Sequence, residues 1–120
     1  MDARQLGKWG EEQALLFLND RGYSTVAAGY RSRFGEIDLI VKNRDFIVFV
    51  EVKLRKNTNF AYAREYVGKA KQKKLIATAN LWLASHSRIN LQPRFDVIEI
   101  YAPESENTKA PEIIHIENAF

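Results

Sequence analysis

The chain has 120 residues, of which 46% are hydrophobic and 28% charged, proportions typical of one compact globular domain spanning residues 1–120. It contains no cysteine, which excludes disulfide scaffolds, thiolate zinc sites, iron–sulfur clusters and cysteine nucleophiles. The net charge is +3, no apolar run approaches the ~20 residues of a membrane helix, and the charged N-terminus lacks the apolar stretch of a signal peptide, so we expect a cytoplasmic protein without a membrane segment.

The N-terminal half predicts one helix followed by strands. Apolar residues recur at helical spacing over residues 4–20, and Gly22 is a typical residue for the end of a helix. A short strand is expected at 23–28. Two stronger strand patterns, Gly35–Lys42 and 46–53, are separated only by a short polar turn. These two strands therefore form a predicted hairpin.

The C-terminal half predicts a loop, a second helix and two more strands. The loop is expected at 55–60, the helix over Lys69–Ser85, and the strands at 94–101 and Glu112–Ile116, separated by a polar segment bounded by proline. On the helix, four residues share one predicted inward face: Gln72, Ile76, Ala79 and Leu83. This order of elements predicts an α/β fold with a mixed central sheet and flanking helices.

Candidate catalytic residues concentrate in the hairpin. Residues two apart on a strand face the same way, so Glu51 and Lys53 project together, and Val50 and Val52 project to the other face. On the preceding strand the same rule predicts two alternating sets, Glu36, Asp38 and Ile40 against Ile37, Leu39 and Val41. A turn centred on Arg44 and Asp45 would place Asp38 directly opposite Glu51.

Two facing carboxylates predict a cation site. Like charges with β-carbons ~5 Å apart are destabilising unless a cation lies between them or one proton is retained. Mg²⁺ takes oxygen ligands, usually one or two carboxylates with waters and phosphate oxygens. Lys53 could then orient a water molecule or neutralise charge on a phosphate. A plain Glu51–Lys53 ion pair on the surface is the structural alternative, and it would contribute only ~0–1 kcal/mol.

A third acid is predicted on the first helix. Glu11 precedes Ala14, Leu15 and Leu18 at helical spacing, which places its carboxylate on the inward stripe. A charge that faces inward needs a partner, and a shared metal site would supply one. Glu11 could instead be favoured simply by its position in the first turns of a helix.

Basic residues are concentrated between Lys53 and Lys74. This segment holds eight Lys or Arg residues and one Glu, a local charge of +7, whereas the other residues sum to −4. Such segregation indicates a surface that faces a polyanion, although a solvated loop and helix face would also explain it. Three aromatic residues of the segment could stack on bases or cover the core: Phe60, Tyr62 and Tyr66. Farther along the chain, Arg94 and Asp96 are expected to form a structural pair.

The order of these motifs resembles the PD-(D/E)XK nuclease superfamily, with Asp38 as the first acid and Glu51-Val52-Lys53 as its E-x-K. The chain is similar, nearly from end to end, to the YraN-type family of small predicted endonucleases related to archaeal Holliday-junction resolvases. The segments that carry this similarity are GKWGEEQA, GYRSRFGEIDLI, FVEVKLR, KQKKLIATANLWL, RFDVI and HIENAF.

The resemblance implies a restriction-endonuclease-like core and roles for individual residues. Asp38, Glu51 and Glu11 would bind Mg²⁺ or Mn²⁺ together with the Val52 carbonyl, Lys53 would be the catalytic lysine, and Gln72 the polar residue of the following helix. The implied activity is hydrolysis of phosphodiester bonds in nucleic acid, with branched or structured DNA as the expected substrate. The alternative is a non-cleaving nucleic-acid-binding module of a DNA repair or recombination assembly.

Nucleic acid is the expected partner, and a homodimer would suit a substrate with two related strands. The residues expected to contact phosphates are Arg31, Arg33, Arg55, Lys56, Lys69, Lys71, Lys73 and Lys74.

Overall fold

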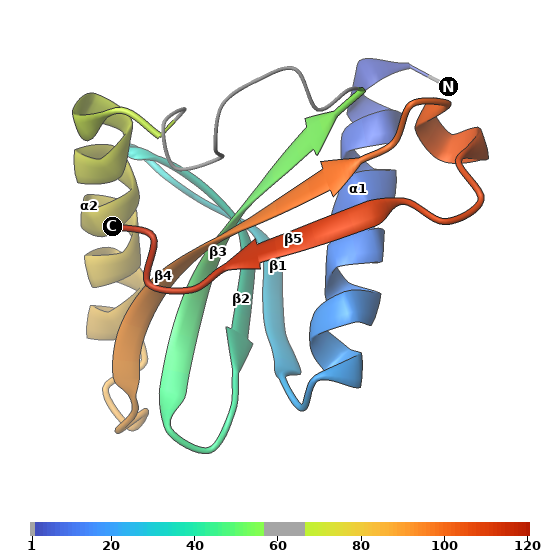
Figure 1. The fold of residues 1–120 in the computed structure, drawn as a ribbon. Coiled ribbons are helices and arrows are strands. Elements are labelled where there is room, and N and C mark those ends of the chain that lie inside the picture. The colour runs from blue at the N-terminus through green and yellow to red at the C-terminus, as the bar shows by residue number, and fades with distance from the viewer. Residues whose placement is uncertain (1, 57–66) are drawn as a thin grey trace.

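A computed structural model describes residues 2–56 and 67–120, which form a mixed five-stranded sheet between two helices (Figure 1). The elements in chain order are α1 (Ala3–Asp20), β1 (Ser24–Ser32), β2 (Gly35–Lys42), β3 (Phe46–Arg55), α2 (Lys69–Ser85), β4 (Gln92–Tyr101), the short 3₁₀ helix η2 (Ser105–Asn107) and β5 (Glu112–Ile116). This is the expected α/β class, and it is consistent with a restriction-endonuclease-like core. None of the helices in the described ranges is long and apolar enough to span a membrane.

The strands lie in the order of the sequence, β1 to β5. All neighbouring pairs are antiparallel except β3 and β4, which run parallel. Parallel neighbours need a crossover connection, and α2 lies within the one that joins β3 to β4. The predicted hairpin is confirmed. The predicted loop at 55–60 is wrong at its first residue, because Arg55 is the last residue of β3 and lies opposite Tyr101 of β4, whereas residues 57–60 lie outside the described part of the chain.

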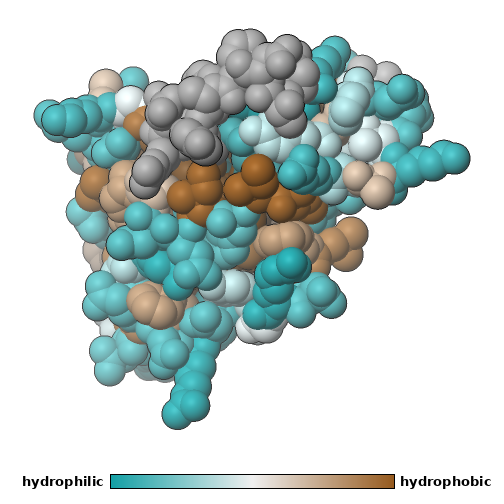
Figure 2. Space-filling view, in the orientation of Figure 1, coloured by the Kyte–Doolittle hydropathy of each residue, from teal (hydrophilic) through white to brown (hydrophobic). Residues whose placement is uncertain are grey.

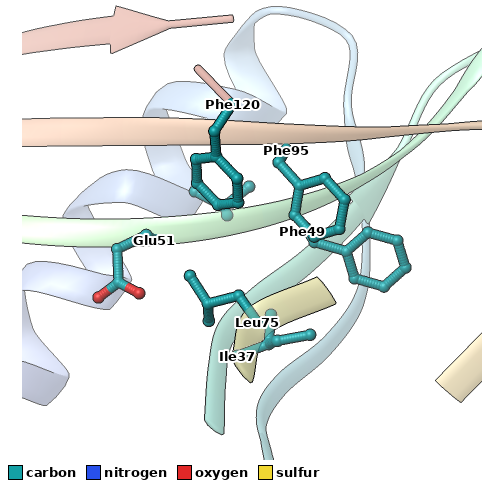
Figure 3. A pocket seen from close by; sticks show the side chains of 7 residues that line it. Ile37, Phe49, Glu51, Leu75, Phe95 and Phe120 are labelled. Atoms are coloured by element: carbon teal, nitrogen blue, oxygen red, sulfur yellow. The ribbon is translucent and has the colours of Figure 1, made fainter. Parts of the chain in front are cut away.

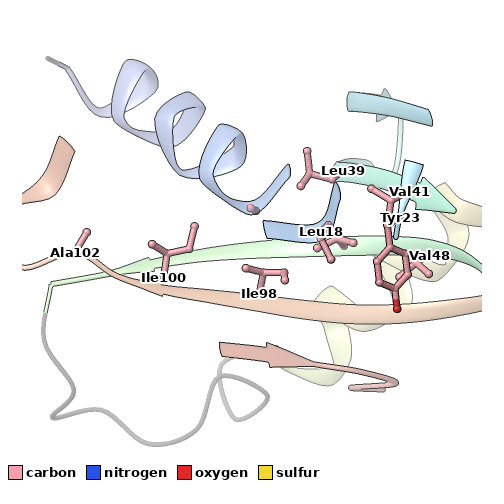
Figure 4. Close-up of a cluster of buried hydrophobic side chains, with 10 residues drawn as sticks. Leu18, Tyr23, Leu39, Val41, Val48, Ile98, Ile100 and Ala102 are labelled. Carbon is pink, nitrogen blue, oxygen red and sulfur yellow. The ribbon is translucent and has the colours of Figure 1, made fainter. Parts of the chain in front are cut away.

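The two helices cover opposite faces of the sheet, so the sheet has a core on each side (Figure 1). On the α1 side, Ala14 and Leu18 pack against buried side chains of the central strands such as Val48 and Ile98 (Figure 4). On the α2 side, Trp82 packs against Phe49 and other buried residues. The face shown in Figure 2 is mainly hydrophilic, with a band of hydrophobic residues across its middle.

The buried face of α2 differs from the predicted one. Its buried residues are Leu75, Thr78, Ala79 and Trp82, whereas Ile76 is 40% exposed. The observed stripe follows helical spacing, and it is rotated from the predicted one toward Trp82, the largest apolar side chain of the helix. Lysines occupy much of the remaining surface of this helix.

The predicted alternation along β2 is also wrong at one point. Ile37 packs on the α2 side together with Ile40, whereas Leu39 and Val41 pack on the α1 side, so the alternation breaks at Asp38. Gly29 lies opposite this residue, between the pairs Ala28–Leu39 and Tyr30–Ile37, and its φ of 71° is in the left-handed region that glycine adopts without strain. This glycine allows the alternation of inward and outward side chains to break at the same point in β1 and β2. Asp38 therefore does not follow the regular alternation of β2.

Candidate active site

The strands β2 and β3 separate at the position of the candidate acids. Their pairing follows the predicted register from Lys42–Ile47 to Leu39–Val50 and ends there. The direct cross-strand pairing of Asp38 with Glu51 is therefore not formed. Instead, the Asp38 carboxylate accepts a hydrogen bond of 2.8 Å from the backbone N–H of Val52, the residue after Glu51. We call this opening between the strands the β2–β3 fork.

Glu51 lies on the α2 side of β3 and is only 8% exposed. It borders a small apolar pocket of about 10 Å³ whose walls include Phe49, Phe95 and Phe120, and Figure 3 shows its carboxylate directed away from these rings. Its Oε1 atom lies 3.1 Å from Lys71 Nζ and 3.9 Å from Lys53 Nζ. One buried carboxylate is thus shared by two lysines.

The surroundings of Asp38 disfavour its charged form. Burial raises the pKa of Asp38 to about 7, together with the neighbouring charge of Glu51, although the hydrogen bond from Val52 lowers it. The charge of Glu11 adds to the increase. Two acids from different strands therefore meet in a space where the negative charges repel one another.

Glu11 approaches the β2–β3 fork from the opposite face, because it belongs to α1. Its side chain is half-buried, whereas Glu12 is exposed, as the helical spacing predicts. Burial raises the pKa of Glu11, and the charges of Glu36 and Glu51 add to this effect while Lys8 opposes it. Glu11 also lines a groove of about 470 Å³, whose wall includes Lys8 and Arg31. The fork is therefore adjacent to groups from both faces of the sheet.

Lys53 and Glu51 project from the same face of β3, as predicted. Lys53 is 18% exposed, and burial lowers the pKa of its ammonium group even though the Glu51 charge raises it; the positive charge of Lys71 lowers it further. An ammonium group in this setting can donate hydrogen bonds to a phosphate or a water molecule beside Glu51.

The position of Lys71 in the site is not indicated by the local sequence pattern. Lys71 was predicted only as a phosphate contact, yet it makes the shorter of the two ion pairs with Glu51. Burial lowers the pKa of Lys71, but the charge and hydrogen bond of Glu51, together with smaller effects of Lys53 and Asp38, outweigh burial and raise this pKa above its usual value. A usable signal was present: α2 follows β3 through a crossover, which brings the first turn of the helix near the end of that strand.

Gln72 does not point its amide nitrogen at the acids. Its Nε2 donates a hydrogen bond of 2.7 Å to the backbone carbonyl of Val67, and its own backbone N–H donates to the carbonyl of Gly68. The side chain therefore holds the start of α2 in place.

The residues expected to contact phosphates are spread over several surfaces. Lys56, Lys69, Lys73 and Lys74 are exposed. Arg31 pairs with Glu36 at 3.4 Å, and the Arg33 guanidinium lies over the Phe34 ring at 4.9 Å. Arg55 is oriented by buried Glu99, 3.6 Å away, which also accepts a hydrogen bond from the Tyr101 hydroxyl. The aromatic residues Phe60, Tyr62 and Tyr66 lie outside the described residues.

The donor set of the β2–β3 fork fits a magnesium-type ion. Within 2–56 and 67–120, no group of three or more Asp, Glu, His or Cys side chains is arranged to hold a metal ion, so Glu11 does not complete the expected three-acid site with Asp38 and Glu51. The fork offers the two carboxylates of Asp38 and Glu51 and the backbone carbonyl of Val52, the residue that follows Glu51 in the chain. Mg²⁺ usually takes one or two protein carboxylates and completes its shell with water and phosphate oxygens, so two acids suffice.

The predicted Arg94–Asp96 pair is confirmed as part of a buried network. Arg94 donates two hydrogen bonds of 2.8 Å to the Asp96 carboxylate, which also accepts from His115 Nε2 at 2.7 Å and from the Asn118 amide. The Tyr23 hydroxyl accepts a further bond from Arg94. Burial raises the pKa of Asp96, but these hydrogen bonds outweigh it and hold the pKa below its usual value. The network ties the C-terminal segment to β4.

Comparison with known proteins assigns the chain to a family. The model of "Uncharacterised protein family UPF0102" matches residues 10–100. The chain belongs to the UPF0102 family. This is the YraN-type family expected from the sequence, and the matched residues include Glu11, Asp38, Glu51, Lys53 and Lys71.

Similar UPF0102 proteins come from several different organisms. The UPF0102 protein of Clostridioides difficile strain 630 is 40% identical over 120 residues, which cover all of both chains. That of Caldanaerobacter subterraneus is 38% identical over the whole chain and 98% of the relative. One from Acinetobacter baumannii strain AYE is 47% identical over 97 residues, covering 80% of this chain and 73% of the relative. The family name does not state an activity, so the function is inferred from the residues of the site.

Proposed function

We propose that this UPF0102 protein is a metal-dependent endonuclease that hydrolyses phosphodiester bonds in nucleic acid. The observation that carries the proposal is the meeting of Asp38 and Glu51 at the β2–β3 fork, with the Lys53 ammonium beside Glu51. Burial and mutual repulsion raise the pKa of Asp38 to about 7, which is unfavourable for a structural acid but suits a cation-binding one.

The residues of the fork have separable roles in this reaction. Asp38, Glu51 and the Val52 carbonyl would hold Mg²⁺ or Mn²⁺, which supplies Lewis-acid stabilisation of the phosphoryl oxygens and acidifies bound water. Lys53 donates hydrogen bonds that orient the attacking water and offset the charge that develops on phosphorus oxygens. Glu11, which approaches from α1, accepts a hydrogen bond from water on the opposite side of the fork.

The substrate is held by phosphate contacts. The exposed lysines of α2 lie on the same face as Glu51, and Arg31 borders the groove that Glu11 lines on the other face. Neutralisation of phosphates by such residues gives affinity without reading base sequence. On the strength of the family resemblance, structured or branched DNA is the substrate that we propose, bound by a monomer or a homodimer.

A substrate panel tests the proposal directly. Purified protein is incubated with labelled DNA and with RNA, each in the presence of Mg²⁺, Mn²⁺ or EDTA. The DNA substrates are a duplex, a flap, a branched replication-type junction, a four-way junction and a single strand. We expect cleavage of at least one substrate in the presence of metal and none in EDTA. Binding without cleavage under every metal condition would contradict the proposal and favour the non-cleaving module of a repair or recombination assembly.

A further inference from the structure

Glu51 has ion-pair partners on two different elements. The ammonium groups of Lys71 on α2 and Lys53 on β3 lie 3.1 Å and 3.9 Å from the same oxygen, Oε1. A divalent ion on this carboxylate would be a third positive centre at a site that is only 8% exposed. Because like charges a few ångströms apart repel strongly in such surroundings, we expect one lysine to leave when the ion binds.

The two lysines differ in their freedom to leave. Lys53 lies within β3, opposite Glu99 in the backbone register with β4. Only 18% of its side chain is exposed. Lys71 lies in the first turn of α2 with 45% of its side chain exposed. A lysine ammonium is carried on a flexible four-carbon stem, so Lys71 can turn toward solvent without any change in the backbone. Lys71 is therefore the one that leaves.

The start of α2 offers the displaced ammonium group a second partner. The first turn of the helix has no acidic residue, and Lys69, Lys73 and Lys74 are exposed near Lys71 in sequence. A positive surface of this kind attracts phosphates. Meanwhile the hydrogen bond from Gln72 to the Val67 carbonyl holds the helix start, which confines the movement to the Lys71 side chain.

We propose that Lys71 is an exchangeable counter-ion of Glu51 that couples divalent-metal binding to nucleic-acid binding. The inference rests on the proposed function, because it requires a metal at Asp38 and Glu51 and phosphates at α2. Without ligands, Lys71 neutralises Glu51; with both bound, the metal takes Glu51 and Lys71 contacts a phosphate. Since both ligands favour the outward position of Lys71, each raises the affinity of the protein for the other.

The first test measures metal affinity without nucleic acid. Mn²⁺ is titrated calorimetrically into wild type, Lys71→Met, Lys71→Arg and Lys73→Met, after melting curves in EDTA have shown that each variant is folded. We expect Lys71→Met to bind Mn²⁺ roughly 5-fold more tightly or better, the lower end of ordinary coupling between sites, because the competing charge is gone. Lys71→Arg retains the competing charge, and Lys73→Met removes one elsewhere on the helix, so both should resemble wild type.

The second test measures the coupling itself. Binding of a short duplex DNA is compared in EDTA and in Ca²⁺, which takes the same oxygen ligands, and the length of the DNA is checked on a gel after each titration. Ca²⁺ should tighten DNA binding by wild type and Lys73→Met. Lys71→Met should bind DNA more weakly than wild type in EDTA, because one cation is lost. Ca²⁺ should then tighten its DNA binding little or not at all.

The outcomes separate this inference from the proposed function. Equal Mn²⁺ affinity in wild type and Lys71→Met overturns the counter-ion exchange but leaves the metal site in place. Tighter Mn²⁺ binding by Lys71→Arg as well as Lys71→Met overturns it too, because arginine keeps the competing charge. No Mn²⁺ binding by any of the four proteins overturns both the exchange and the metal-dependent reaction.

Discussion

The Asp38 carboxylate accepts a 2.8 Å hydrogen bond from the backbone N–H of Val52, at the point where the pairing of β2 with β3 has ended. A side chain of β2 thus accepts a hydrogen bond from a backbone N–H of β3. In a longer ladder that N–H would donate to the backbone of β2 instead. Val52 stands between Glu51 and Lys53 in the chain, so this bond fixes the backbone from which both side chains project. The acid that would bind metal also positions the second acid and the lysine.

The first prediction concerns Glu51 and Lys53. We expect Glu51→Gln to abolish cleavage, because a neutral amide is a poor ligand for Mg²⁺, and Lys53→Ala to lower the rate by about 10²–10³-fold through loss of a charged donor. Both variants should still bind nucleic acid, since most phosphate contacts lie elsewhere. Cleavage rates and binding isotherms on the same substrate check this, with exposed Glu12→Gln as the control. Wild-type rates in both variants would show that the fork is not the active site.

The second prediction follows from the pKa of Asp38. In the folded protein this pKa is raised from 3.8 to about 7, so the folded state binds more protons than the unfolded state between these values. The contribution of Asp38 to the free energy of unfolding is therefore full below pH 3.8 and is lost as the pH rises to about 7. Asp38→Asn keeps an acceptor for Val52 but removes this dependence. Melting temperatures of both proteins in EDTA from pH 4 to pH 8 measure the difference.

The same variant tests metal binding without any substrate. An ion that binds only the folded state stabilises it by ~2.7 kcal/mol at a hundred times its Kd. We expect millimolar Mn²⁺ to raise the melting temperature of wild type and to have little effect on Asp38→Asn. Asp45→Asn, which changes an exposed acid in the turn at the other end of the hairpin, should respond to Mn²⁺ like wild type. An equal metal-induced shift in wild type and Asp38→Asn would exclude Asp38 as a ligand.

Much of this architecture could be predicted from local sequence. Periodicity located α1, α2 and the hairpin to within a few residues, because apolar spacing and turn residues act over short distances. The register of the hairpin followed from the short turn between its strands. The inward direction of Glu11 followed from helical spacing alone.

The features that were missed depend on distant parts of the chain. The break in alternation at Asp38 requires Gly29 on the neighbouring strand, and no pattern within β2 indicates it. The contact of Lys71 with Glu51 depends on how the crossover places α2 against the sheet. Likewise, the Arg94–Asp96 pair has partners from both ends of the sequence, Tyr23 on Arg94 and His115 on Asp96. Tertiary packing determines each of these contacts, and local sequence propensity does not predict how distant segments pack.

A third prediction concerns salt. Each phosphate neutralised on duplex DNA releases counterions, which lowers the logarithm of the binding constant with a slope of about −0.9 per contact against the logarithm of salt concentration. Lys73→Ala and Lys74→Ala should each reduce that slope by up to ~0.9 and leave sequence preference unchanged. Fluorescence anisotropy over a range of salt concentrations measures the slope. A wild-type affinity that does not change with salt would contradict a phosphate-binding surface on α2.

A fourth prediction concerns the buried network around Asp96. Asp96→Ala leaves Arg94 without its bidentate partner in a buried position, and removal of one member of a buried pair costs about 3–5 kcal/mol. For a domain of this size we expect the melting temperature to fall by about 10–20 °C. Asp45→Ala, at an exposed position, should change it by no more than a few degrees. A small effect of Asp96→Ala would show that the network does not hold the C-terminal segment to the sheet.

The last prediction separates the two roles of glycine in this fold. Gly29 has a φ of 71°, and a Cβ there would meet Glu36 Oε1 only at an ordinary 3.6 Å, so the cost of Gly29→Ala is backbone strain of about 1–2 kcal/mol. Gly7→Ala, on α1, adds a Cβ with no atom within 4 Å and should stabilise the helix by about 0.5–1 kcal/mol. Because Gly29 lies opposite Asp38, its substitution should also shift that carboxylate and weaken the stabilisation by Mn²⁺, whereas Gly7→Ala should preserve it. Denaturation curves of both variants, with EDTA and with Mn²⁺, give all four values. Retention of the full Mn²⁺ stabilisation in a destabilised Gly29→Ala would show that the break in face alternation at Gly29 is not what places Asp38 in the β2–β3 fork.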